Sequence, residues 1–219
     1  MILKTSERFS SLSHMTGAVA AMLGTLVLIV VTRHRGDLLS ISLVYGFSIV
    51  FLFSASTIYH ARKRSEDENS LWRKFDHLAI FFMIAGTYTP LCYIYLEGGW
   101  KWGIIIAQWS LVIIGSLFKF FYLKAPRFIS TIIYLLMGWM AVIVVGKLLP
   151  IMTMKEVIFL FSGGIFFTIG AVVYIIKFPD PLAGRIGFHG IFHIFIMLGG
   201  AVHYLMVYHC VTGALALHG

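Results

Sequence analysis

The stretch Leu38–Tyr59, LLSISLVYGFSIVFLFSASTIY, contains no charged side chain from end to end. A helix needs about 20 mostly apolar residues to cross the hydrocarbon core of a bilayer, and this stretch is long enough. Similar runs lie on both sides of it. They divide the chain into seven predicted spans, at residues 15–32, 38–59, 75–96, 103–118, 128–146, 157–176 and 186–208. The pattern predicts an all-α membrane protein, with a single seven-transmembrane helix bundle over residues 1–219.

The composition supports the same class of protein. Of the 219 residues, 59% are hydrophobic and only 12% are charged, and the mean hydropathy is +0.91. A soluble domain is about one-quarter charged, so this chain lacks the charge to cover a water-exposed surface. The composition excludes a cytosolic enzyme, a secreted disulfide scaffold and a disordered chain. The net charge of +8 does not indicate a nucleic-acid partner, because no basic cluster lies on a soluble domain.

Two cysteines, Cys92 and Cys210, lie inside apolar runs without metal-binding or redox spacing. Both are predicted to be small buried hydrophobic residues.

The Lys and Arg residues are divided unequally between the two sides that the spans define. One side receives Lys4, Arg8, Arg62, Lys63, Arg64, Arg73, Lys74, Lys119, Lys124, Arg127, Lys177 and Arg185. The other side receives Arg33, Arg35, Lys101, Lys147 and Lys155. Because cytoplasmic loops carry an excess of Lys and Arg, the N-terminus is predicted to be cytoplasmic and the C-terminus outside. Most of the positive charge is thus a topology signal.

Ionisable side chains in or near membrane spans are costly and are therefore candidates for function. Asp76 is the one acidic residue that the sequence places at the margin of a predicted span. His60 ends the second span, Asp76 begins the third, and His189 and His193 begin the seventh. With the N-terminus inside, all of these residues are predicted to lie at the cytoplasmic membrane face.

The spacing of these residues suggests a metal site. His189 and His193 are four residues apart and share one helix face, as do Ser56 and His60. Three imidazoles on two helices can fill three positions of a tetrahedral zinc site and leave the fourth for water, which is a catalytic arrangement. Asp76 is then suited to orient a ligand or to deprotonate the water, and Ser56 to bind the water or a substrate carbonyl.

Simpler interpretations of the same residues remain open. Paired histidines near an interface are also typical of polar residues at headgroup level. Asp76 is also suited to cap the start of a helix, and Ser56 to allow close helix packing. His203 lies about 21 Å along the helix from His189 and is predicted to hydrogen-bond another helix. Gly190 follows His189, so the chain lacks the His-Glu-x-x-His motif of zincins.

Four segments resemble the bacterial hemolysin III family, a branch of the progestin and adiponectin Q receptor (PAQR) superfamily. They are ERFSSLSHMTG (Glu7–Gly17), FSASTIYHA (Phe53–Ala61), FDHLAIFFMIAGTYTP (Phe75–Pro90) and HGIFHIFIMLGGAVH (His189–His203). The seven-helix layout with the N-terminus inside also matches this family. One departure is Ser10, which stands where the family usually has Asn.

The resemblance implies a zinc site and a role in membrane-lipid homeostasis. It aligns His60, His189 and His193 with the zinc ligands of the superfamily, and Ser56 and Asp76 with the polar partners at the metal. The superfamily is similar to alkaline ceramidases in this pattern, which implies zinc-dependent hydrolysis of a lipid amide. The expected partners are membrane lipids, and the expected location is the inner (plasma) membrane, crossed several times.

A second hypothesis stays open beside the enzyme. The protein is then a non-enzymatic, receptor-like sensor of lipid state, or a cytolysin, and zinc serves only as a structural link between helices. A transporter ranks lowest, because the sequence shows no acidic residue at mid-membrane and no inverted repeat.

Overall fold

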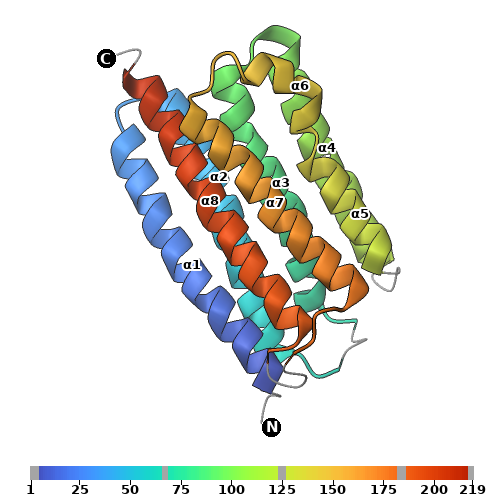
Figure 1. The fold of residues 1–219 in the computed structure, drawn as a ribbon. Coiled ribbons are helices and arrows are strands. Elements are labelled where there is room, and N and C mark those ends of the chain that lie inside the picture. Colours follow the sequence, from blue (N-terminus) through green and yellow to red (C-terminus); the bar gives the residue numbers. More distant parts are fainter. Residues whose placement is uncertain (1–4, 66–68, 123–126, 182–185, 217–219) are drawn as a thin grey trace.

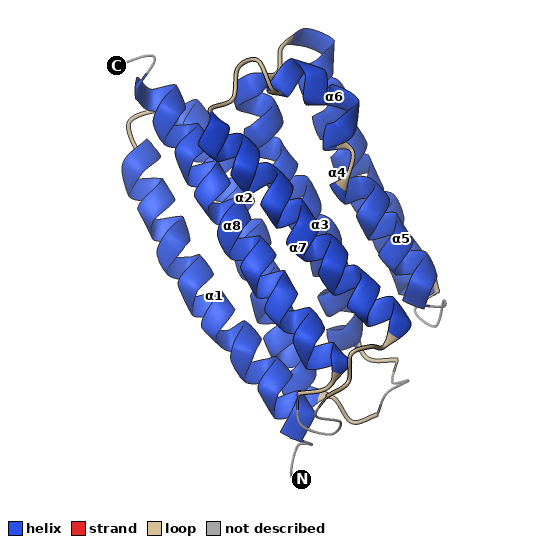
Figure 2. Ribbon diagram, in the orientation of Figure 1, coloured by secondary structure: helices blue, strands red, loops and turns tan. Residues whose placement is uncertain are grey.

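The computed structural model describes residues 5–65, 69–122, 127–181 and 186–216. Within these residues every regular element is a helix (Figure 2). The helices are α1 (Thr5–Thr32), α2 (Gly36–Arg62), α3 (Leu71–Tyr95), α4 (Gly98–Phe121), α5 (Arg127–Gly138), α6 (Ala141–Leu148), α7 (Met154–Ile176) and α8 (Phe188–Ala216). Together they provide seven segments long and apolar enough to cross a membrane, with α5 and α6 sharing one of them. The predicted seven-helix class is confirmed.

The helices run side by side along one direction, and the two ends of the chain lie at opposite ends of the bundle (Figure 1). Helix α2 packs between α1 and α3, α7 packs along α8, and α8 also contacts α1 and α3. Helices α5 and α6 follow one another at an edge of the bundle, where α5 contacts α3 and α7. The start of α1, the end of α2 and the start of α8 therefore meet at the end where the chain begins (Figure 1).

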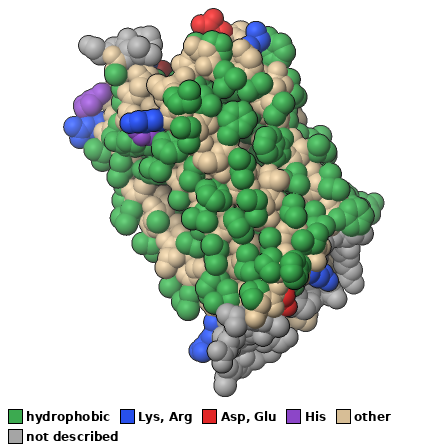
Figure 3. Space-filling view, in the orientation of Figure 1, with side chains coloured by type: hydrophobic (Ala, Val, Ile, Leu, Met, Phe, Trp, Pro, Cys, Tyr) green, Lys and Arg blue, Asp and Glu red, His purple; other side chains and the backbone are tan. Residues whose placement is uncertain are grey.

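Apolar side chains cover the visible face of the bundle, and the visible charged side chains lie towards its two ends (Figure 3). Leu23 of α1, Ile113 of α4 and Leu136 of α5 are each about 60% exposed or more. A surface so rich in exposed apolar side chains is stable in lipid rather than in water. The chain is a multi-pass membrane protein.

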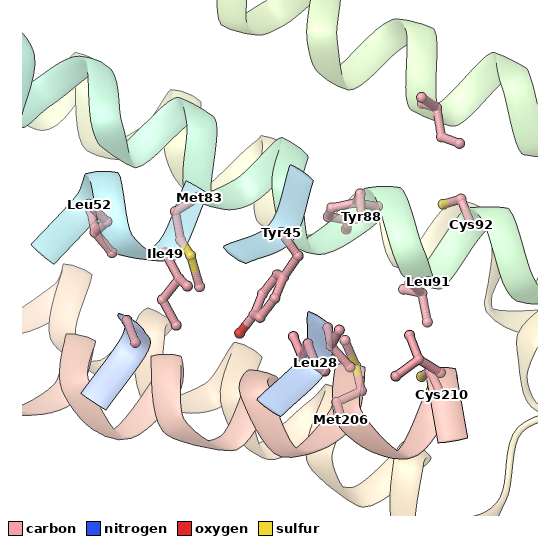
Figure 4. Close-up of a cluster of buried hydrophobic side chains, with 14 of the residues drawn as sticks. Leu28, Tyr45, Ile49, Leu52, Met83, Tyr88, Leu91, Cys92, Met206 and Cys210 are labelled. Carbon is pink, nitrogen blue, oxygen red and sulfur yellow. The ribbon is translucent and has the colours of Figure 1, made fainter. Parts of the chain in front are cut away.

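The interior is packed with apolar side chains from α1, α2, α3, α4, α6 and α8, and Figure 4 shows part of this core. Tyr45 of α2 and Met206 of α8 are fully buried in this core, with Leu28 of α1 beside them. Cys92 and Cys210 are also fully buried there as free thiols, which confirms their prediction as small hydrophobic residues.

The fifth span is interrupted, whereas its apolar run predicts a continuous helix over residues 128–146. Helix α5 ends at Gly138, and α6 begins at Ala141. In lipid, the backbone groups freed by such a break need partners. The Tyr88 hydroxyl of α3 supplies two of them: it donates to the Gly138 carbonyl at 2.6 Å and accepts from the Ala141 N–H at 2.6 Å. Gln108 of α4 donates to the Met137 carbonyl at 2.9 Å.

Helix α1 begins at Thr5, although its apolar run predicts a start at residue 15. The additional turns carry Glu7, Ser10 and His14, which are all buried. Their polar side chains face the bundle, so hydropathy underestimates the length of the helix. The prediction that Asp76 is the one acidic residue at the margin of a span is therefore wrong, because Glu7 lies in the first turn of α1. Glu156 is buried as well, at the start of α7, where the Tyr95 hydroxyl donates to it at 2.6 Å.

Candidate metal centre

Three histidines meet at the end of the bundle where the chain begins. His60 lies in the last turn of α2, and His189 and His193 lie in the first two turns of α8. The Nε2 atom of His189 is 3.4 Å from Nε2 of His60 and 3.0 Å from Nε2 of His193. One ligand nitrogen from each residue lies within 4.8 Å of the other two. The structure thus brings together the three residues that the sequence predicted as ligands, and they are positioned to bind a metal ion.

The spacing of these nitrogens suits zinc. Zn–N bonds of about 2.0–2.1 Å at tetrahedral angles place neighbouring nitrogens about 3.3–3.4 Å apart. His60 and His193 are each 1% exposed, and His189 is partly buried. Imidazole binds zinc as a neutral ligand, which avoids the high cost of burying charged ligands in lipid. The donor set, its spacing and its burial therefore fit the metal that the resemblance implies.

Glu7 of α1 holds the first of these ligands. The His60 Nδ1–H donates to Glu7 Oε2 at 2.7 Å, and Lys63 Nζ donates to Glu7 Oε1 at 2.7 Å. A histidine whose Nδ1–H is held in this way presents the lone pair of Nε2 to a metal. The pairing with Lys63 also balances the charge of the buried carboxylate. Glu7 thus orients His60 without contacting the metal position.

The role of Glu7 was missed in the sequence, although Glu7 lies in a segment that carries the resemblance. Its partner His60 is 53 residues away, and the hydropathy pattern placed Glu7 outside the first helix. The sequence does contain one indication that Glu7 belongs to the first helix. Glu7 and His14 are seven residues apart, or two helical turns, so both side chains lie on one face of a helix that begins before Glu7.

Replacing Glu7 by glutamine is expected to weaken zinc binding about 10-fold or more, because loss of a residue that orients a ligand histidine costs 10- to 100-fold in metal affinity. The amide still accepts from His60, but it lacks the charge that increases the basicity of the imidazole and pairs with Lys63. Competition between the purified protein and a zinc chelator measures the change. The matched control is Glu97→Gln, an exposed glutamate at the far end of the bundle. Equal zinc affinity in Glu7→Gln and the wild type would contradict this role.

Ser56 and Asp76, the two predicted polar partners, take different places. Ser56 lies one turn before His60 in α2 and is 3% exposed. Asp76 lies in the second turn of α3, where its carboxylate is 3.6 Å from Nδ1 of His77. It does not belong to the three-histidine cluster found among the described residues. The roles of Ser56 and Asp76 at a metal remain predictions.

The alternative interpretation of Asp76 as a helix cap is wrong. Helix α3 begins at Leu71, and the capping residue is Ser70, whose hydroxyl accepts from the Arg73 N–H at 3.3 Å. Asp76 lies beyond the first turn, where it cannot satisfy the free N–H groups of the helix start.

Two other span histidines, His77 and His203, have hydrogen-bond partners close by. His77 Nδ1 donates to the Arg73 carbonyl at 2.8 Å. His203 Nε2 donates to the Leu160 carbonyl of α7 at 3.2 Å, which confirms the prediction that it bonds to another helix.

The fold and this cluster define the protein as a helical, multi-pass membrane protein with a buried three-histidine site suited to a metal ion. Residues 3–204 match the family described as Haemolysin-III related. The chain belongs to this haemolysin III family.

Curated proteins of two kinds are similar to the chain. It is 32% identical to Hemolysin-3 of Bacillus cereus over 206 residues, covering 92% of this chain and 90% of that protein. It is 31% identical to the Hemolysin-3 homolog of Bacillus subtilis (strain 168) over 210 residues, covering 94% of each. It is also 25% identical to the human Monocyte to macrophage differentiation factor, a PAQR-type protein, over 173 residues (75% of this chain and 68% of that protein).

Proposed function

We propose that this protein is a zinc-dependent hydrolase that cleaves an amide of a membrane lipid and thereby serves membrane-lipid homeostasis. The observation that carries the proposal is the convergence of three imidazole nitrogens, two of them from buried histidines, with the orientation of His60 set by Glu7. Three protein ligands are typical of catalytic zinc sites, whereas structural sites use four. Because these histidines lie on membrane-spanning helices, the substrate that reaches them most directly is a lipid of the membrane itself.

Zinc bound to His60, His189 and His193 would supply a Lewis acid and a water molecule of lowered pKa. In the proposed reaction the oxygen of a water molecule adds to the amide carbon, and Asp76 accepts a proton from this water. The Ser56 hydroxyl donates a hydrogen bond to the oxyanion that develops on the carbonyl oxygen. Asp76 then returns the proton to the amide nitrogen as the C–N bond breaks, which releases a fatty acid and an amine.

The location of the cluster supports a lipid substrate. The histidines lie in the terminal turns of α2 and α8, so their depth corresponds to the polar boundary of the bilayer, where the amide linkage of a lipid lies. With the predicted orientation, this boundary is the cytoplasmic face of the inner membrane. Acyl chains of the substrate would lie along the apolar helices.

The second candidate is a lipid-state sensor or a cytolysin with a structural metal. One observation favours a structural role: the three histidines join the end of α2 to the start of α8, so a bound ion would also cross-link two segments 129 residues apart in the chain. This candidate predicts that metal binds and stabilises the fold, but that no lipid is cleaved.

A hydrolysis assay tests the proposal. The protein, purified in detergent and reconstituted into vesicles that contain a ceramide, is expected to release fatty acid. A zinc chelator should abolish the release, and added zinc should restore it, because the reaction requires the metal-bound water. Vesicles that contain only ester-linked lipids serve as the control for the amide. A protein that binds zinc but releases no fatty acid from ceramide would contradict the enzyme and favour the sensor or the cytolysin.

A further inference from the structure

His14 of α1 is a buried imidazole for which the described residues provide no hydrogen-bond partner. It is 3% exposed, and neither Nδ1 nor Nε2 has a partner in the described part of the chain. Its ring centroid lies 3.9 Å from that of His193 and 5.2 Å from that of Phe53. A buried donor or acceptor that lacks a partner destabilises the fold, so a position used only for packing would favour an apolar residue. The imidazole at this position therefore suggests a polar role.

His193 also has a ring nitrogen that lacks a hydrogen-bond partner in the described part of the chain. This atom is Nδ1, which is buried. A histidine that binds a metal through Nε2 carries its hydrogen on Nδ1 and almost always donates it to a neighbouring acceptor. Glu7 fills this role for His60, but no carboxylate among the described residues does so for His193. Of the described aromatic rings that contact His193, the His14 ring lies nearest, with centroids 3.9 Å apart.

The helix that would supply both partners is α1. Glu7 and His14 are seven residues apart, which places them on one face of α1 and about 10 Å apart along its axis. On α8, His193 lies one turn beyond His189. Helix α1 thus passes the metal cluster with one polar side chain against α2 and a second against α8.

We propose that His14 is the positioning residue for the metal ligand His193: a His14 ring nitrogen accepts the hydrogen bond of His193 Nδ1–H. This inference rests on the metal binding that underlies the proposed function. The two ring centroids are 3.9 Å apart and the rings are tilted by 45° in the structure, so this hydrogen bond requires the His14 ring to turn and to move away from the His193 ring. The main-chain carbonyl of His193 also lies beside the His14 ring, but not in hydrogen-bonding geometry.

Zinc affinity of three variants, measured by chelator competition on the full-length protein, tests the inference. His14→Phe keeps an aromatic ring but removes both nitrogens, and it is expected to bind zinc about 10- to 100-fold more weakly. His14→Gln retains an oxygen that accepts a hydrogen bond and should recover a substantial part of this loss. The matched control is His209→Phe, a histidine on α8 about 24 Å beyond His193, which packs against Phe159 and should bind zinc normally.

A second readout separates positioning from general damage to the fold. The visible absorption of Co²⁺ bound in place of zinc reports the geometry of the ligands, and it should shift in His14→Phe but not in His209→Phe. Wild-type affinity and an unchanged Co²⁺ spectrum in His14→Phe would overturn the inference, and so would a His14→Gln variant as weak as His14→Phe. In either case the proposed metal site stands. Failure of the wild type to bind zinc would instead overturn the proposed function.

Discussion

Replacement of His60 by alanine is expected to reduce bound zinc from about one ion per chain to less than about a tenth. The two remaining ligands, His189 and His193, lie on the same helix and cannot complete a tetrahedral site. The substitution also removes the histidine that Glu7 orients, and it leaves the carboxylate with Lys63 as its one partner in the described residues. Elemental analysis of the purified protein after gel filtration measures the loss.

The matched control is His34→Ala, an exposed histidine in the turn between α1 and α2, which should retain the full zinc content. The thermal stability of the zinc-free wild type provides the reference for folding, because the His60 variant should resemble it. A His60→Ala protein that keeps one zinc per chain would exclude the three-histidine site.

Replacement of Asp76 by asparagine is expected to lower the rate of lipid-amide hydrolysis by about 10²- to 10⁴-fold, the usual contribution of a general base. Asparagine keeps the size of the side chain but cannot accept the proton of the water. Because Asp76 lies outside the cluster of ligand nitrogens, the variant should still bind zinc with nearly unchanged affinity. Fatty-acid release and zinc content, measured on the same preparation, test both halves of this prediction.

The control for Asp76 is Asp37→Asn. Asp37 forms an ion pair with Arg35 at 3.0 Å near the opposite membrane face, so its loss should leave hydrolysis unchanged. Wild-type hydrolysis by Asp76→Asn would show that another group is the base. Loss of zinc together with activity would show that Asp76 supports the metal rather than the proton transfer.

The number of spans could be predicted from the sequence because lipid leaves few choices. In lipid, the backbone N–H and C=O groups of a run such as Leu38–Tyr59 must hydrogen-bond to one another. In a single isolated span, only a helix achieves this. The break between α5 and α6 could not be predicted in this way. Its exposed carbonyl and N–H are satisfied by Tyr88, about 50 residues earlier in the chain, and hydropathy contains no information on such a partner.

The candidate site was predictable to the extent that it depends on helix periodicity and topology. The interval between His189 and His193 and the side of the membrane on which His60 falls were sufficient to bring the three ligands together. The residues that orient them were not predicted, because Glu7 and His14 lie in a polar segment that hydropathy excluded from the first span. Their contacts arise only when α1 packs against α2 and α8.

The assembly of the metal centre from α1, α2 and α8 has a consequence for biosynthesis. The ribosome completes α1 and α2 early, so Glu7 and His60 can pair while most of the chain is still unmade. His189 and His193 follow only after four further membrane spans have been made. A nascent or truncated chain therefore presents one ligand and cannot retain the ion. An ion held by all three histidines would therefore be loaded after insertion, and it would mark chains whose last helix has docked.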